Sequence, residues 1–499
     1  MQELHIGRNQ EVKVFLLLTV YTIILMFFCA GSSPFIDYCT VDSAVFRTMG
    51  LGMAARKVPY RDLFDHKGIY IYFLNYIGAL ISKHSSFGLY VVETLFMITN
   101  AILLYKIAQK YDVTYRRSFF FALIGLLLLV NYVTYQGGNF VETYAITFQL
   151  ISIYYLVSFT VDKEENKHLA YYMMIWGICV GVVSFLRLNL VFMWIGIVCV
   201  VLVKLAVDRK FKLFMRSVCS GLFGILIGVL PAIIYCVRFK CLKQMIDASI
   251  LFNIRYATHS GMNLLDKFMS LFSNMGSKII IGLCLASLIV IARSSVDAYM
   301  KSIYVLSLVF SLISVGMSGY AYGHYYEYLI PFVLPLILYF VKRIRIKKNI
   351  LLVIGVFIMS ILCNLRMPIR VMLNDVSKEY QKTEIANEMY VIYKEKFPQY
   401  KSMLAVNNNS LFYIVFDNVP ELKYFYTPQI PYEDFPDAID SQINSILSGE
   451  NDILVINYAD STAKTIFDAN IDNDKIMQYL DQKYDIALEK NGMCMYVRK

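Results

Sequence analysis

The chain has 499 residues, of which 58% are hydrophobic, 15% aromatic and only 17% charged, and its mean hydropathy is +0.54. Soluble domains are about one-quarter charged, so this composition excludes an ordinary soluble globular protein and indicates a polytopic membrane protein. The formal net charge of +10 lies largely in short segments between apolar runs, as membrane topology requires, so we predict no nucleic-acid partner. The ten cysteines form no CxxC pair and no regular framework, so they predict neither a metal site nor a disulfide scaffold.

Apolar runs recur along the first 365 residues. A run of about 18 or more residues is long enough to cross a bilayer whose hydrocarbon core is about 30 Å thick. We interpret the first run as an uncleaved helix, because it is long for a signal peptide and no small-residue cleavage site follows it. About eleven membrane spans are predicted, at 14–33, 88–107, 118–135, 142–160, 170–186, 189–206, 217–237, 277–293, 301–318, 326–341 and 349–364.

Basic residues are distributed unevenly over the connections between these runs. Lysine and arginine are concentrated at 106–117, 204–216 and 342–348, whereas the connections 136–141 and 319–325 contain neither. Because cytoplasmic loops carry the excess of positive charge, the pattern predicts a cytoplasmic N-terminus. With an odd number of spans, the C-terminus is then expected on the outer face of a bacterial plasma membrane.

Two regions outside the runs have predicted structure of their own. In the first outer loop, 34–87, helical spacing at 42–56 and a short apolar segment at 69–82 predict two helices along the membrane interface. We predict a transmembrane domain at 1–365, which includes this loop, and a small extracytoplasmic α/β domain at 366–499. The predicted strands of that domain are 403–407, 452–457, 484–490 and 493–499, and its predicted helices are 375–397, 434–448 and 472–482.

The first candidate functional residue is Asp42, at the start of the first interfacial helix. A carboxylate at the membrane surface could take a proton from an acceptor hydroxyl as that oxygen attacks a sugar carbon. An aspartate before a helix also serves as an N-cap for unpaired backbone N–H groups. From the residues alone, the general-base and N-cap interpretations stay equally open.

A second candidate cluster lies in the same loop and consists of Arg61, Asp62, Asp65, His66 and Lys67. Its basic side chains could hold a lipid phosphate at the level of the headgroups. A solvated turn whose acids and bases pair locally explains the same residues. The residues alone slightly favour this structural interpretation.

Three further polar groups flank the apolar runs. Arg187 and Asn189 lie between two runs, where a charge near membrane depth indicates function unless Arg187 snorkels to the interface. His324 and Glu327 lie in the segment YAYGHYYEY; an aromatic belt explains its tyrosines but not these two residues, which favours a substrate site. Glu142 starts a helix, where the helix dipole favours an acid, so a substrate contact is the less favoured interpretation.

Five segments together resemble the GT-C superfamily of membrane glycosyltransferases, chiefly bacterial members related to protein O-mannosyltransferases and aminoarabinose transferase. The segments are VDSAVF, VPYRDLFDHKG, YQGGNFVETY, FLRLN and YGHYYEYLIPF, and the resemblance spans about residues 10–365 in order and topology. The segment Tyr424-Phe425-Tyr426 resembles extracytoplasmic tails of some bacterial members.

The resemblance implies an enzyme that moves a sugar from a polyprenyl-phosphate donor to an extracytoplasmic glycan, lipid or protein acceptor, with inversion at the anomeric carbon. It implies that Asp42 is the catalytic carboxylate, which acts as the general base, and that Lys67 lies near the lipid phosphate. The outer-face histidine and tyrosine motif of the family corresponds to His324 and Tyr325, which are expected to contact the donor phosphate. Arg61 and Arg187 are further expected phosphate contacts, and Asp62, Asp65, His66, Glu142, Asn189 and Glu327 are candidate substrate contacts.

One position departs from the family pattern. Many relatives have a second acid beside the catalytic one, whereas Ser43 follows Asp42 here. Because paired acids are the usual metal ligands, we predict a metal-independent enzyme without a cofactor; whether Asp62, Asp65 or Glu142 assists stays open. The expected reaction is a single in-line displacement, in which basic side chains offset the charge on the leaving polyprenyl phosphate.

Two other functions fit the composition. A transporter or flippase of lipid-linked glycans would commonly show internal repeats with helices broken at the membrane midplane, but the sequence shows no convincing repeat. A polymerase or ligase of lipid-linked glycans would favour large basic outer loops, and segment 238–276 is such a loop. The sequence contains no interpretable pattern for the sugar or the acceptor.

Overall fold

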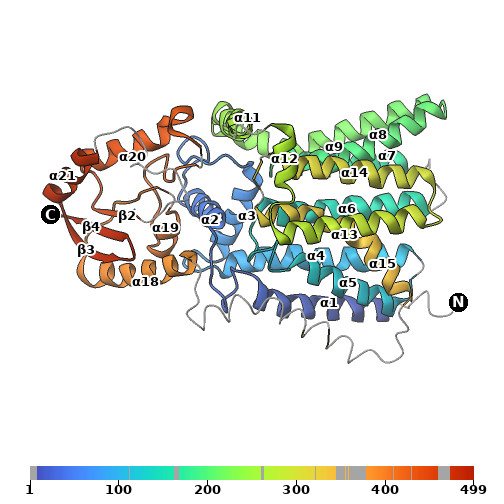
Figure 1. The fold of residues 1–499 in the computed structure, drawn as a ribbon, viewed down its shortest axis with the longest axis horizontal. Coiled ribbons are helices and arrows are strands. Elements are labelled where there is room, and N and C mark those ends of the chain that lie inside the picture. The colour runs from blue at the N-terminus through green and yellow to red at the C-terminus, as the bar shows by residue number, and fades with distance from the viewer. Residues whose placement is uncertain are drawn as a thin grey trace. The chain divides into compact units, whose positions relative to one another are not determined.

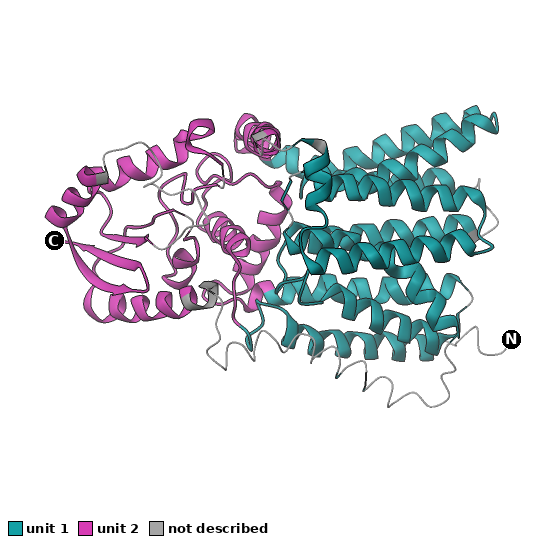
Figure 2. Cartoon of the chain, in the orientation of Figure 1, with its two compact units in different colours: residues 1–36, 90–235, 260–369 teal, residues 37–89, 236–259, 370–499 magenta. Residues whose placement is uncertain are grey.

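The chain forms two compact units in a computed structural model (Figure 2). Unit 1 comprises Met1–Ile36, Tyr90–Tyr235 and Ser260–Ile369, and unit 2 comprises Asp37–Leu89, Cys236–His259 and Arg370–Lys499. The structure describes residues 8–111, 113–161, 168–259, 263–317, 319–320, 322–343, 355, 358, 378–407, 409–428, 430–458 and 473–499.

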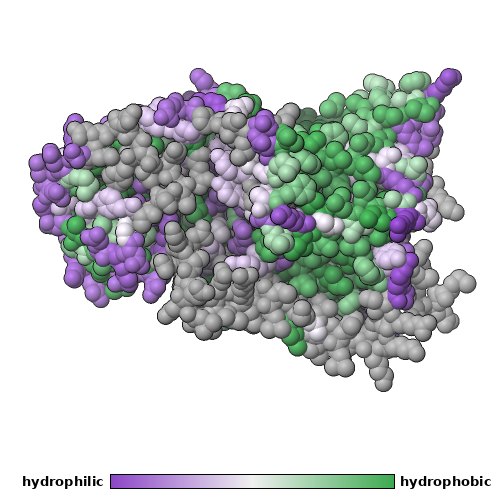
Figure 3. All heavy atoms as spheres, in the orientation of Figure 1, coloured by the Kyte–Doolittle hydropathy of each residue, from purple (hydrophilic) through white to green (hydrophobic). Residues whose placement is uncertain are grey.

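Unit 1 is a bundle of apolar helices that run side by side (Figure 1). Apolar side chains also face outward, as on α9, where Leu222 and Phe223 are 61% and 56% exposed. Figure 3 shows apolar surface over much of the bundle, which suits a hydrocarbon solvent. The elements in or entering unit 1 are α1 Arg8–Cys29, α4 Phe87–Lys110, α5 Tyr115–Leu129, α6 Val141–Val161, α7 Leu169–Ser184, η1 Leu188–Val191, α8 Phe192–Val207, α9 Phe211–Arg238, α12 Leu264–Ser270, α13 Met275–Arg293, α14 Ala298–Gly316, η3 Gly323–Val333 and α15 Leu334–Arg343.

Within the described residues, eight helices are long and apolar enough to cross a membrane, and each coincides with a predicted span. The predicted spans 118–135 and 170–186 correspond to α5 and α7, which have 15 and 16 residues and are short for a span. The predicted span 349–364 lies almost wholly outside the described residues. The total of eleven spans therefore stays a prediction.

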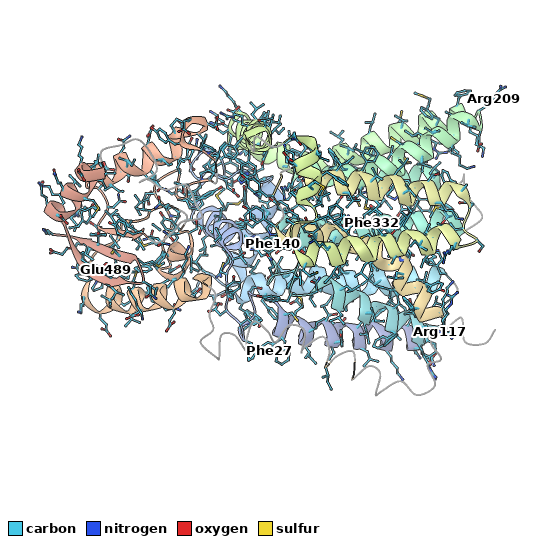
Figure 4. The ribbon with its side chains drawn as sticks, viewed as in Figure 1. Phe27, Arg117, Phe140, Arg209, Phe332 and Glu489 are labelled. Atoms are coloured by element: carbon cyan, nitrogen blue, oxygen red, sulfur yellow. The ribbon has the colours of Figure 1, made fainter. Side chains whose placement is uncertain are left out.

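Two basic residues lie at the same end of the bundle. Arg117 and Arg209 lie at one end of unit 1, and Phe140 lies toward the other (Figure 4). Both arginines belong to the connections that the sequence predicts to be cytoplasmic. The segregation of charge agrees with that prediction, while the orientation in a membrane stays a prediction.

The first outer loop forms two helices close to the predicted positions, α2 Val41–Ala54 and α3 Ile69–Ile81. They pack closely because residue 50 is glycine: a Cβ on Gly50 would lie 2.5 Å from the backbone carbonyl carbon of Asn75. At 13 residues, α3 is shorter than a span, as the sequence predicts. The loop's polar residues lie on α2 and in the connection between α2 and α3.

The C-terminal segment contains a mixed four-stranded sheet with strand order β1-β2-β4-β3. β1 and β2 are parallel, whereas β4 is antiparallel to both of its neighbours. Apolar residues of the strands and helices form one core, including Leu404, Ile443, Leu454 and Leu480. The elements are α18 Lys378–Lys396, β1 Met403–Ala405, α19 Leu411–Val415, η4 Tyr432–Asp434, α20 Pro436–Ser448, β2 Ile453–Asn457, α21 Asn473–Lys483, β3 Tyr484–Lys490 and β4 Met493–Arg498.

Unit 2 combines three segments that are far apart in the sequence. The first loop and the C-terminal segment are joined by α10 Leu242–Ile246, a π-helical turn at Asp247–Leu251 and α11 Phe252–His259. The Phe64 ring stacks on Phe435 at 5.2 Å and meets Phe252 edge-on at 5.5 Å. The compact unit that contains Asp42 is therefore assembled from both sides of the predicted boundary at residue 365.

Candidate functional site

Most of the polar residues singled out in the sequence lie in two clusters, one in each unit. We call the first the loop cluster and the second the bundle cluster. The loop cluster consists of Asp42, Asp65, His66, Lys67 and Asn253 in unit 2. The bundle cluster consists of Glu142, Arg187, His324, Tyr325 and Glu327 in unit 1.

Asp42 lies in the first turn of α2 and is partly exposed. It is not the N-cap: the helix is capped by Thr40, whose hydroxyl accepts a 3.2 Å hydrogen bond from the backbone N–H of Ser43. The N-cap interpretation of Asp42 is therefore wrong, because another oxygen fills that role. The carboxylate is close enough to act electrostatically on His66 and Tyr426, so it belongs to the loop cluster.

Asp65 is the buried anchor of the loop cluster, with only 2% of the residue exposed. Its Oδ1 accepts hydrogen bonds from the backbone N–H of His66 at 2.7 Å and from the hydroxyl of Tyr426 at 2.6 Å. Its Oδ2 accepts one from the hydroxyl of Tyr72 at 2.8 Å. A buried carboxylate requires such partners. The arrangement makes Asp65 a structural link between the first loop and the C-terminal segment.

His66 and Lys67 follow this anchor in the chain, and their side chains are in contact. The Nζ atom of Lys67 lies 3.0 Å from Nε2 of His66, and Nδ1 of His66 lies 2.9 Å from Oδ1 of Asn253. Burial, with a further contribution from the Lys67 charge, lowers the pKa of His66 to about 4. The imidazole is therefore neutral at neutral pH, and the charge of the pair resides on Lys67.

Arg61 and Asp62 form a local pair instead of joining this arrangement. The guanidinium donates to both carboxylate oxygens, with Nε–Oδ1 and Nη2–Oδ2 distances of 2.8 and 2.9 Å. Asp62 also accepts a 2.8 Å hydrogen bond from the backbone N–H of Val58. Hydrogen bonds from Arg61 lower the pKa of Asp62. For these two residues the geometry favours the structural interpretation of a locally paired turn.

The bundle cluster is organised around an ion pair. Arg187 follows the end of α7, where the chain breaks as predicted, and its Nη1 lies 2.7 Å from Oε1 of Glu142. The guanidinium also lies over the ring of Tyr325, 4.3 Å from the ring centre. The Glu142 side chain is 1% exposed and that of Arg187 17%. Arg187 is therefore a paired residue of the bundle and does not snorkel freely to the interface.

The remaining residues of the bundle region make neutral contacts. The His324 ring stacks on Phe140 at 4.1 Å, with the two rings nearly parallel. Glu327 is fully buried and accepts a 2.8 Å hydrogen bond from the hydroxyl of Thr143. The Asn189 side chain donates to the backbone carbonyl of Ser314 at 3.0 Å. These contacts fix η3 and η1 within unit 1.

Sequence reasoning missed Asn253 and Thr143, and it gave Tyr426 no role. Asn253 lies in a segment that the sequence indicates only as a basic loop, and no local motif points to its contact with His66. Tyr426 was detectable only through the family-like segment that contains it. Within the described residues, no group of three or more histidine, cysteine, aspartate or glutamate side chains is arranged to hold a metal ion.

Solved membrane glycosyltransferases have the same fold. ArnT from Cupriavidus metallidurans in the apo state aligns with a TM-score of 0.64 and 11% identity, over 98% of each chain. The same protein bound to undecaprenyl phosphate aligns with a TM-score of 0.62 and 10% identity, again over 98% of each chain. Arabinofuranosyltransferase AftD from Mycobacteria aligns with a TM-score of 0.50 and 10% identity, over 99% of this chain and 40% of AftD.

These matches show that the chain has the fold of the GT-C membrane glycosyltransferases, as the sequence resemblance predicts. The chain belongs to the family of competence-induced Ccs4 N-terminal domains, whose profile matches residues 3–362. No curated protein matches the sequence.

Proposed function

We propose that this protein is a glycosyltransferase that moves a single sugar from a polyprenyl-phosphate donor to a hydroxyl group of an extracytoplasmic acceptor. The GT-C fold supports the reaction class. The loop cluster is the observation that carries the proposal. One compact unit contains a partly exposed carboxylate that does not cap its helix, Asp42, and a lysine held by a neutral imidazole, Lys67.

The proposed mechanism follows from the chemistry of these two side chains. Asp42 accepts the proton of the acceptor hydroxyl as that oxygen forms a bond to the anomeric carbon of the sugar. The bond from the anomeric carbon to the phosphate oxygen breaks, and the configuration at the carbon inverts. Lys67 offsets the negative charge on the departing polyprenyl phosphate, and preorganised electrostatic stabilisation of this kind is usually the largest catalytic term.

Other expected contacts enter this proposal with narrower roles. Asp62 and Asp65 accept hydrogen bonds in the turn and the anchor, and the base in this proposal is Asp42. Arg187 and Glu142 keep each other paired in the bundle, and His324 is stacked on an aromatic ring. No step needs a metal ion, because Ser43 replaces the second acid. The acceptor is a glycan, lipid or protein at the outer face of a bacterial membrane, in line with the segregation of basic residues to one end of the bundle.

The test is a transfer assay with the full chain in liposomes that contain polyprenyl-phosphate sugars and candidate acceptors. Each sugar transferred should release one free polyprenyl phosphate, and a chelator should not change the rate. A transporter or flippase would move the lipid-linked sugar between leaflets without a transfer product. A polymerase or ligase would require a lipid-linked oligosaccharide. Either result would overturn the proposal.

A further inference from the structure

The groups around His66 determine which ring nitrogen carries the hydrogen atom. The side-chain nitrogen of Asn253 lies 2.6 Å from the backbone carbonyl oxygen of His66 and 3.0 Å from that of Ser249. Carbonyl oxygens only accept, so this nitrogen is the amide NH₂ and the orientation of the Asn253 side chain is fixed. Its oxygen therefore faces Nδ1 of His66, 2.9 Å away, and Nδ1 must donate the hydrogen atom.

A neutral imidazole with its hydrogen on Nδ1 presents a lone pair at Nε2. That lone pair faces the Lys67 ammonium at 3.0 Å, and an ammonium is a donor only. The two contacts thus form one directed chain, in which Lys67 donates to Nε2 of His66 and Nδ1 of His66 donates to Asn253. An imidazolium could not take part, because both of its nitrogens donate and its charge would repel Lys67.

The surroundings of the ring keep it neutral. Phe252 and Tyr256 of α11 lie beside it, with ring centres 5.1 and 5.9 Å away. The charged groups that act on it are Lys67, the carboxylate of Asp65 (4.0 Å from Nε2) and Asp42. Burial and Lys67 outweigh the two acids and lower the pKa of His66 to about 4.

Lys67 is also fixed through its backbone. Its carbonyl oxygen accepts a 2.8 Å hydrogen bond from the hydroxyl of Tyr60, and its N–H donates to the hydroxyl of Tyr72 at 3.1 Å. Lysine has a flexible four-carbon stem and loses entropy when a ligand orders it. A side chain held at the backbone and near the ammonium has lost much of that freedom before any ligand arrives.

We propose that Asn253 and His66 are positioning residues that set the direction of the Lys67 ammonium for a polyprenyl phosphate headgroup. A neutral acceptor suits this task because it holds the cation without cancelling its charge. The inference rests on the proposed function, in which Lys67 contacts the carrier phosphate.

The first experiment measures binding of undecaprenyl phosphate to the full chain in nanodiscs, with thermal melting as the check on folding. Lys67→Gln should weaken binding on the order of tenfold or more, because a charge-assisted hydrogen bond is lost. His66→Asn should weaken binding, since the shorter amide reaches the Nδ1 position only. His66→Gln should bind nearly as the wild type does, because its amide oxygen can occupy the Nε2 position and accept from Lys67.

The second experiment is the pH profile of the Asn253→Asp variant. A carboxylate at this position favours the imidazolium and should raise the pKa of His66. The ratio of the variant's Kd to that of the wild type should therefore be several-fold at pH 5.5 and approach one at pH 8.5. Titration of the phosphate affects both Kd values equally and cancels in the ratio. If the variant lost affinity only through a structural change, the ratio of the Kd values would be the same at every pH. That result would overturn the inference, even if the His66 variants fail to fold.

The Lys67→Gln and His66→Asn variants distinguish a failure of the proposed function from a failure of the positioning role alone. If folded Lys67→Gln binds undecaprenyl phosphate as the wild type does, the phosphate contact in the proposed function is wrong, and the inference is lost with it. If Lys67→Gln weakens binding but His66→Asn does not, only the positioning role of His66 and Asn253 is overturned.

Discussion

The bundle cluster and the loop cluster contain similar side chains but use them differently. In the bundle cluster, a cation meets a buried acid and an aromatic ring, so Arg187 has its charge offset within the protein. In the loop cluster, Lys67 contacts the neutral imidazole of His66, and this contact does not cancel its charge. Removing one partner of a buried ion pair leaves an uncompensated charge and destabilises the fold. We therefore expect the bundle cluster to act in the structure, and we propose the loop cluster for binding.

The largest expected effect comes from breaking the bundle cluster. Arg187→Met leaves the Glu142 carboxylate without its partner, and removing one member of a buried pair costs about 3–5 kcal/mol of unfolding free energy. The loss should appear as a lower free energy of unfolding in detergent. The double variant Arg187→Met with Glu142→Gln removes the orphaned charge and should recover most of it. Equal losses in the single and double variants would show that the ion pair is not what holds this region.

In the loop cluster, the stability of the protein should depend on pH through His66. The pKa of His66 is about 4 in the folded protein and about 6.5 in an unfolded chain. The unfolded state therefore binds the proton first as pH falls, and stability is lost between about pH 6.5 and pH 4, by about 3 kcal/mol at most. The difference in unfolding free energy between the wild type and His66→Gln isolates this contribution. A difference that does not change over this range would mean that the ring is not held neutral.

The smallest effect is expected for the Arg61–Asp62 pair. Its side chains are 44% and 28% exposed, and exposed ion pairs contribute about 0–1 kcal/mol. Arg61→Gln should therefore change the unfolding free energy only slightly and leave undecaprenyl phosphate binding close to that of the wild type. A loss of lipid binding as large as that of Lys67→Gln would restore Arg61 to the phosphate site.

The sequence predicts local structure well and distant contacts poorly. Periodicity locates α2, α3 and the four strands, because each element is defined by neighbours within a few residues. The break before Arg187 is equally local. The cap of α2 is not decided by spacing, since Thr40 and Asp42 both fit the pattern and only the observed hydrogen bond selects Thr40.

The candidate site depends on pairs that no local pattern records. Asn253 is 187 residues from His66, and Tyr426 is 361 residues from Asp65. The anchor role of Asp65 is therefore visible only when the first loop and the C-terminal segment are folded together. Family resemblance predicts roles for Asp42 and Lys67, but it does not indicate which residues contact them.

Sugar transfer by Asp42→Asn in liposomes tests whether the Asp42 carboxylate is the general base. Asp437→Asn is the matched control, because Asp437 is an exposed acid at the same second position of its helix, α20. We expect transfer by Asp42→Asn to fall on the order of 10²–10⁴-fold while undecaprenyl phosphate binding and melting temperature stay unchanged, with the control fully active. Transfer at the wild-type rate by folded Asp42→Asn would contradict this role.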